Sequence, residues 1–124
     1  MSGGYFDYSQ YNMQSIAESI KNIIYNNKNE EENEWGEKRG MFFSDEIIDL
    51  FSKTEVLLRV SEILVNRADY LLSCDDGPDS YIRRVKEDLN HLFLKKDEAY
   101  KEMKKSVYSI LFKKLKNEKG EKND

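Results

Sequence analysis

The longest regular pattern of hydrophobic and polar positions lies in the middle of the chain, between residues 44 and 73. Ser44 is followed by Asp45 and Glu46. This favours a helix start, because the hydroxyl can cap free amides and the acids lie at the positive end of the helix dipole. Hydrophobic residues then recur at the spacing of an amphipathic helix, which predicts one long helix over residues 44 to 73. The main stripe of this helix consists of Ile47, Leu50, Phe51, Thr54, Leu57, Leu58, Ser61, Leu64, Val65, Ala68, Leu71 and Leu72.

A second hydrophobic stripe runs along the same predicted helix, nearly opposite the main stripe at about 100° per residue. It consists of Val56, Val60, Ile63 and Tyr70. One neighbouring helix cannot cover two opposed stripes. Either two other helices of the chain lie on the two sides of the central helix, or one stripe contacts another copy of the protein. We expect a homo-oligomer in which the second stripe forms the interface between copies.

The segment before the central helix predicts one helix and one loop. Residues 7 to 26 carry hydrophobic residues at helical spacing and can be capped by Asp7 or Ser9. Residues 27 to 43 are rich in Asn and Glu and predict a polar loop. Trp35 stands alone in this loop, and we expect its side chain to fold back as a loop anchor rather than to serve as a ligand platform.

The segment after the central helix predicts two further helices and a tail. Residues 77 to 94 form a helix in which Pro78 takes the favoured first position. Residues 97 to 117 form a fourth helix or the continuation of the third, and residues 118 to 124 are a polar tail. The 124 residues suffice for a single core. The expected fold is therefore one all-α domain, a small bundle of three to four helices around one long central helix.

Composition excludes several classes of protein. The single cysteine, Cys74, cannot form an internal disulfide, and no Cys/His cluster indicates a metal site. We therefore expect no cofactor and a reducing, cytoplasmic location. The N-terminus lacks the features of a secretory signal, and no apolar run reaches about 18 residues, so we expect neither export nor a membrane span.

The segment SCDDGPDSYIRR, residues 73 to 84, joins the second and third predicted helices. Gly77 and Pro78 are typical of a turn before a helix, and the neighbouring acids can cap exposed amides. A calcium-binding loop does not fit, because two of its acids would have to stand at Leu72 and Cys74. The sequence therefore favours a turn.

The turn does not account for the two arginines that follow it. They either pair with acids of the same helix or offer planar donors to a phosphate or carboxylate of a partner. The candidate binding residues of this segment are Asp75, Asp76, Tyr81, Arg83 and Arg84.

The N-terminal stretch GGYFDYSQY is also a candidate binding segment, because it concentrates four aromatic residues behind two glycines. We expect this arm to dock, either on the helices of its own chain or by stacking on a base or inserting into a partner. Its candidate binding residues are Tyr5, Phe6 and Tyr8.

An enzymatic alternative depends on carboxylates. All-helical nucleotide pyrophosphohydrolases hold magnesium with E-x-x-E followed by E-x-x-D. The acids with this spacing are Glu31, Glu34, Glu46 and Asp49. The first two lie in the Asn/Glu-rich loop, where such spacing arises by chance, and His91, the only histidine, has no partner for nucleophilic catalysis. We therefore expect no catalytic residues, with the magnesium-dependent hydrolase as an alternative.

Charge is distributed unevenly along the chain. Residues 1 to 94 hold 10 Lys+Arg against 18 Asp+Glu, whereas residues 95 to 124 hold 10 against 6. A basic amphipathic helix can contact nucleic acid, an anionic membrane or an acidic patch of another subunit, or it can present solvated lysines. Nucleic-acid association is the second alternative function, through Lys104, Lys105, Lys113 and Lys114.

Two parts of the chain together resemble a group of small phage and prophage proteins. In that group an aromatic N-terminus, as in GGYFDYSQY, precedes a Leu-Leu-Ser-x-Asp-Asp-Gly core and an Arg-rich helix start, as in NRADYLLSCDDGPDSYIRRVKEDL. The resemblance covers residues 1 to about 92, and Cys74 and Pro78 stand where the group has Gly and an acid. It implies a viral accessory protein in the host cytoplasm. Such a protein would act stoichiometrically on a host-defence protein or a signalling nucleotide.

Overall fold

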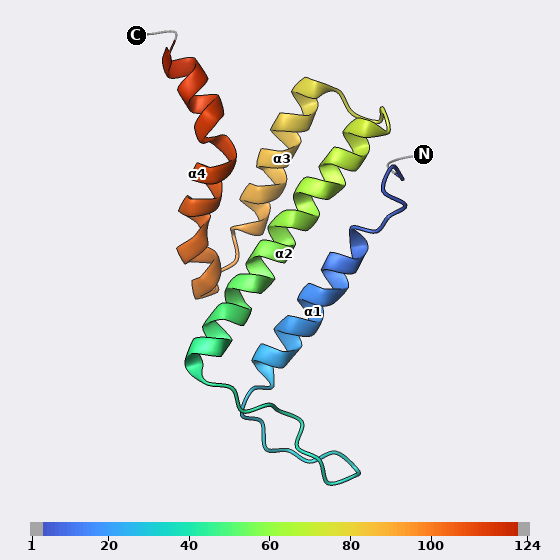
Figure 1. The fold of residues 1–124 in the computed structure, drawn as a ribbon, viewed down its shortest axis with the longest axis vertical. Helices are drawn as coiled ribbons and strands as arrows, with labels where there is room; N and C mark the ends of the chain where they lie inside the picture. Colours follow the sequence, from blue (N-terminus) through green and yellow to red (C-terminus); the bar gives the residue numbers. More distant parts are fainter. Residues whose placement is uncertain (1–3, 122–124) are drawn as a thin grey trace.

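A computed structural model describes residues 4 to 121, with side chains up to Lys113, and this part of the chain forms four α-helices (Figure 1). They are α1 (Tyr11–Tyr25), α2 (Asp45–Leu72), α3 (Pro78–Leu92) and α4 (Glu98–Glu121). Apart from an isolated bridge between Glu32 and Lys38, the described residues form no β-structure. The predicted all-α bundle with one long central helix is confirmed.

α2 is the central helix. In Figure 1, α1 and α3 lie on opposite sides of α2, α4 lies beyond α3, and consecutive helices run in alternate directions. α2 packs against each of the other three helices. Helices of the same chain therefore cover α2 from different sides.

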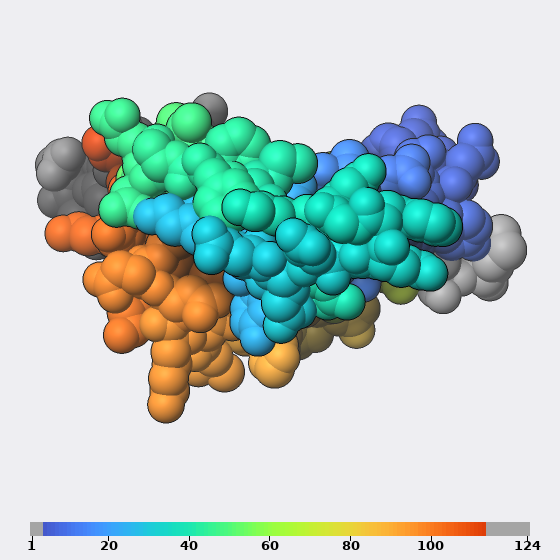
Figure 2. Space-filling view, turned by 90° about the horizontal axis from the view of Figure 1, so that it is seen from below, coloured from blue at the N-terminus to red at the C-terminus, as the bar shows by residue number. Residues whose placement is uncertain are grey.

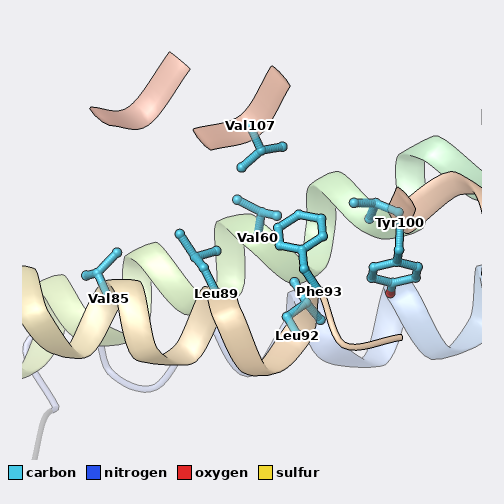
Figure 3. Close-up of a cluster of buried hydrophobic side chains, with 8 residues drawn as sticks. Val60, Val85, Leu89, Leu92, Phe93, Tyr100 and Val107 are labelled. Atoms are coloured by element: carbon cyan, nitrogen blue, oxygen red, sulfur yellow. The ribbon is translucent and has the colours of Figure 1, made fainter. Parts of the chain in front are cut away.

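The core lies between α2, α3 and α4. Val56 and Val60 of α2 are only 0% and 5% exposed. Figure 3 shows Val85 and Leu89 of α3 pointing toward Val60 and toward Val107 of α4. The buried cluster consists of Val56, Val60, Val85, Leu89, Leu92, Phe93, Tyr100 and Val107.

The second stripe is therefore part of the chain's own core. Its prediction as an interface between copies is wrong for Val56 and Val60, because α3 and α4 bury both side chains. Ile63 packs against the same cluster, and the half-buried Tyr70 places its ring centroid 5.6 Å from the Arg67 guanidinium. Periodicity shows that a face is hydrophobic, but it does not show which element covers that face.

The main stripe of α2, by contrast, is only partly covered. None of its members is buried, and Leu50, Leu57 and Leu72 are 62%, 51% and 48% exposed. The wider of the two hydrophobic stripes is thus the one that the described residues leave partly open to solvent.

Local signals predict the starts of α2 and α3 correctly. The Ser44 hydroxyl accepts a hydrogen bond from the Ile47 amide at 3.4 Å, and Pro78 is the first residue of α3. α3 and α4 are separate helices, which decides between the two alternatives for this region. α4 extends to Glu121, beyond the predicted end at residue 117.

α1 begins at Tyr11, four residues later than the sequence predicts. Residues 5 to 10 form successive turns instead, and Asp7 and Tyr8 adopt left-handed φ angles of 55° and 60°. Gln10 precedes the helix without making a side-chain cap. The predicted caps at Asp7 and Ser9 are therefore wrong.

The connection between α1 and α2 is an ordered hairpin, held by asparagine side chains. The Asn27 side chain makes two hydrogen bonds with the Phe43 backbone, of 3.2 and 3.0 Å. At the tip, Asn33 Oδ1 accepts from the backbone amides of Trp35 and Glu37 at 2.9 and 3.0 Å. Gly40 is required here, since a Cβ would lie 2.1 Å from the carbonyl oxygen of Asn26.

Trp35 stands at the tip of this hairpin and is 77% exposed. In Figure 2, which views the molecule from this end, the hairpin (teal) lies in front of the helix ends. The predicted role of Trp35 as a loop anchor is wrong, because the asparagines and the backbone hold the hairpin without it.

Candidate functional site

The N-terminal arm, residues 4 to 10, docks on the C-terminal half of α2. Asp69 is fully buried there, and it accepts hydrogen bonds from the Tyr5 amide at 2.6 Å and the Gln10 side chain at 2.9 Å. Ser73 donates a third bond to Asp69 at 3.2 Å, and Gln10 also reaches Asn66 Oδ1 at 3.2 Å. Of the two predicted alternatives for the arm, docking on its own chain is the one observed.

The aromatic rings of the arm contribute less than its polar groups. Tyr5 and Tyr8 are 60% and 44% exposed. Tyr5 packs edge to face on Phe6, with ring centroids 5.1 Å apart, and Tyr8 stacks on Tyr11 at 6.3 Å. The rings cover each other and remain partly available at the surface.

The hydrogen bonds to Asp69 predict how the arm responds to pH. Burial raises the pKa of the Asp69 carboxyl, but the bonds from Gln10 and the Tyr5 amide outweigh this effect and lower the pKa below its usual value of 3.8. The ionised form is thus favoured in the folded state. Its contribution is present above the unfolded pKa and is lost as the pH falls through the lowered folded pKa.

We therefore expect the arm to stay docked at neutral and mildly acidic pH and to be released only below about pH 4. In an NMR titration, the Tyr5 amide and the Gln10 side-chain amide should shift together, with a midpoint below 3.8. Asp69→Asn should abolish this shared titration. A midpoint above 3.8, or the same titration in the variant, would contradict the assignment.

The arginines of the turn region are paired with carboxylates of the chain. Arg67 of α2 binds Asp88 of α3 through two hydrogen bonds of 2.6 and 3.1 Å. Arg83 lies 3.5 Å from Glu87, one turn further along α3. A hollow of about 510 Å³ lies at this place, lined by Arg67, Arg83, Arg84, Glu87 and Asp88. The arginines that line this hollow are therefore largely neutralised by the carboxylates beside them.

The turn itself is stabilised by its second aspartate. Asp76 Oδ1 accepts the Gly77 amide at 3.0 Å and lies 3.3 Å from Arg84. Asp75 is exposed, whereas Tyr81 is partly buried against the core. Most of these predicted binding residues therefore have a structural role in the turn or the core.

The two predicted binding segments do not form one site. The arm is attached at Asp69, whereas the arginine hollow includes Arg67, and two residues along a helix are about 200° apart in direction. The two segments consequently lie on opposite sides of α2 (Figure 1). A ligand that stacks on Tyr5 while its phosphates meet Arg83 does not fit this arrangement.

The carboxylates of the hydrolase alternative are likewise separated. Glu31 and Glu34 are exposed on the hairpin, whereas Glu46 and Asp49 lie in the first turns of α2. Within the described part of the chain, no group of three or more His, Cys, Asp or Glu side chains is placed to hold a metal ion. His91 is exposed in the last turn of α3.

Among the described side chains of α4, up to Lys113, the lysines form no continuous site with aromatic groups. Lys104 lies 6.0 Å from the ring centroid of Tyr108 on its own helix. Lys105 and Lys113 are exposed, and the side chain of Lys114 lies outside the described residues.

A partly buried polar network, which the sequence pattern does not indicate, connects α1, α2 and α4. Arg59 of α2 binds Glu18 of α1 at 2.7 Å, and its Nε lies 3.8 Å from Glu55 Oε2. The Tyr100 hydroxyl of α4 donates to the same Oε2 at 3.3 Å. Burial, with a smaller effect from the Glu55 charge, raises the pKa of Tyr100, so the phenol stays protonated as a donor.

The partly covered stripe of α2 continues onto α1. Glu18 and Arg59 meet on the side of the α1–α2 pair that faces Tyr100 of α4. Ile16 and Leu57 each precede one of them by two residues, which turns their side chains about 200° away from that side. Ile16 and Leu57, 50% and 51% exposed, therefore lie on the same side of the α1–α2 pair, opposite the network. We call this surface the uncovered face. Its exposed hydrophobic members are Ile16, Ile47, Leu50, Leu57 and Leu72.

Comparison of the chain with protein-family models, with curated proteins and with solved structures gives no match. Among the described helices, none combines the length and apolar character needed to cross a bilayer.

Proposed function

We propose that the chain is a non-enzymatic binding protein that pairs with a second copy of itself through the uncovered face. It then acts stoichiometrically by occupying a host component. The observation that carries this proposal is the half-exposed hydrophobic stripe of α2, continued by Ile16 on α1. Half-exposed leucines in one row over several helical turns are typical of an interface rather than of a solvated surface.

The size of the uncovered face suits a dimer. At about 1.5 Å per residue, the 28 residues of α2 extend over about 42 Å and the 15 residues of α1 over about 22 Å. With each helix about 10 Å wide, the face covers roughly 600 Å² in projection. A standard interface buries about 800 Å² of accessible surface per partner, so the projected area of this face is of the same order.

The charge of the face favours a second copy as its occupant. The twelve positions of the main stripe are uncharged, and so is Ile16, although 35% of the chain is charged. A twofold axis through the face brings identical surfaces together without placing like charges opposite each other. A self-complementary pairing therefore incurs no electrostatic penalty at its centre.

The role as a stoichiometric inhibitor is supported by the resemblance to small phage proteins. The hairpin is not part of the uncovered face, and Trp35 at its tip is 77% exposed. Exposed tryptophans are enriched among residues that dominate protein–protein binding. The hairpin therefore suits contact with a host protein better than the compensated arginine hollow suits a nucleotide.

We expect the wild-type protein to be a dimer in mass measurements by light scattering, and Leu57→Glu to weaken the dimer at least about 30-fold. The added carboxylate would be buried next to its symmetry mate without a counter-ion. Leu94→Glu is the matched control, since Leu94 is 72% exposed and lies outside the uncovered face. A wild-type monomer at high concentration, or equal effects of the two variants, would overturn the proposal.

A further inference from the structure

A second concave surface lies on the other side of the α1–α2 pair, away from the uncovered face. It is an open pocket of about 640 Å³ between the C-terminal half of α1, the N-terminal half of α2 and the start of α4. Such a volume is in the range of small-molecule sites. Apart from Tyr100, its lining residues belong neither to the buried cluster nor to the uncovered face.

One carboxylate in the lining of the pocket, that of Glu55, has a charge that its neighbours compensate only in part. The Glu55 side chain lines the pocket and is 9% exposed. Its contacts with Arg59 and Tyr100 both fall on Oε2, which leaves Oε1 for a ligand. Arg59 approaches Glu55 only to 3.8 Å, because Glu18 engages its guanidinium at 2.7 Å. A buried carboxylate with so distant a counter-ion favours an additional cation.

The lining of the pocket combines apolar, aromatic and acidic residues. Ile24 and Tyr25 line the pocket, and Tyr25 is 87% exposed, so its ring is available to a ligand. Glu98 and Glu102 add carboxylates from the first turns of α4. Apolar walls fit a methylene chain, whereas carboxylates and aromatic rings attract a cation.

Few basic side chains lie in or near the pocket to compensate its carboxylates. Lys21 lines the pocket, whereas Lys53 is bound to Asp49 at 2.8 Å and Lys95 lies 5.5 Å from the ring centroid of Tyr100. The carboxylates that line the pocket are Asp49, Glu55, Asp97, Glu98 and Glu102, so acids predominate along its lining.

We propose that this pocket binds an alkylammonium group on an apolar stem. The ammonium donates to Glu55 Oε1, and the stem lies along Ile24 and the ring of Tyr25. A free aliphatic diamine and a lysine side chain of a protein share this chemistry. The inference does not depend on the proposed self-association, because the two surfaces lie on opposite sides of the α1–α2 pair.

Calorimetric titration of the full chain with 1,5-diaminopentane tests the proposal, with 1,5-pentanediol as the uncharged analogue. The diamine should bind and the diol should give no heat of binding. Glu55→Gln should weaken diamine binding at least tenfold, while Glu46→Gln, which removes an exposed carboxylate of α2 outside the pocket, should leave it unchanged. Equal effects of the two variants would mean nonspecific attraction to an acidic surface and would overturn the proposal.

If Glu55→Gln does not fold, Tyr25→Ala tests the same pocket. Tyr25→Ala removes a ring that is 87% exposed, so the fold stays intact while diamine binding weakens severalfold. A blocked Gly-Lys-Gly peptide distinguishes the two sources of the ligand. Binding of the diamine alone supports a free amine, and binding of the peptide, with or without the diamine, supports a lysine side chain of a protein. Binding of neither, or of the diol as well, overturns the proposal.

Discussion

Replacing Leu89 by Ala should lower the free energy of unfolding by about 2 to 5 kcal/mol. Leu89 is 0% exposed and lies in the cluster that joins α2, α3 and α4. Its truncation removes buried methyl groups and leaves a cavity, because the valines and aromatic rings around it are held on three separate helices. Domains of this size are stable by about 5 to 15 kcal/mol, so the variant should lose a large part of its stability.

Urea unfolding followed by circular dichroism measures this loss as a lower midpoint with an unchanged slope. Leu94→Ala is the matched control, because Leu94 is 72% exposed and should cost less than about 0.5 kcal/mol. If both variants lost the same stability, the packing of α3 on α2 and α4 would have to differ from the one described.

Replacing Arg59 by Ala should cost about 2 kcal/mol of stability. The Arg59 side chain is only 12% exposed, and its removal leaves Glu55 nearly buried, with the Tyr100 hydroxyl as its remaining partner among the described residues. It also removes the ion pair with Glu18 that ties α1 to α2, although half of the Glu18 side chain is exposed and that pair is screened by solvent.

Arg83→Ala is the control for this prediction. Arg83 and Glu87 are 66% and 60% exposed, so the loss of their pair should change stability by less than about 0.5 kcal/mol. Adding Glu55→Gln to Arg59→Ala should restore part of the stability, because it removes the uncompensated charge. A double variant that is less stable than Arg59→Ala alone would contradict the proposed reason for the loss.

The elements of the fold follow from local signals in the sequence. Ser44 before two acids marks the start of α2, and Pro78 after Gly77 marks the start of α3, because caps and first-turn preferences depend on neighbours within a few residues. The hydrophobic period then shows which segments are helical and that α2 carries two stripes.

The contacts between elements could not be predicted in the same way. The Gln10–Asp69 and Glu18–Arg59 bonds join residues that are 59 and 41 positions apart. No local pattern marks such pairs, since Gln, Asp, Glu and Arg are also the residue types that ordinarily occupy solvated surfaces. For the same reason the pocket at Glu55 is absent from the sequence-based candidates.

The two hydrophobic stripes of α2 show a related limit. The sequence predicts that one neighbouring helix cannot cover both stripes, and the described residues leave one of them half-exposed. The stripe that was expected at the interface, with Val56 and Val60, is instead buried. The choice depends on which face α3 and α4 occupy, and this is a property of the assembled bundle.

The exposed position of Trp35 has a practical consequence, because this side chain is the only indole in the sequence. The intrinsic fluorescence of the unlabelled protein therefore originates at the hairpin tip when indole is selectively excited. A ligand that covers the tip would shift the emission and protect it from quenchers, whereas a ligand confined to the helices would leave the spectrum nearly unchanged. The chain thus carries its own optical reporter for the hairpin between α1 and α2.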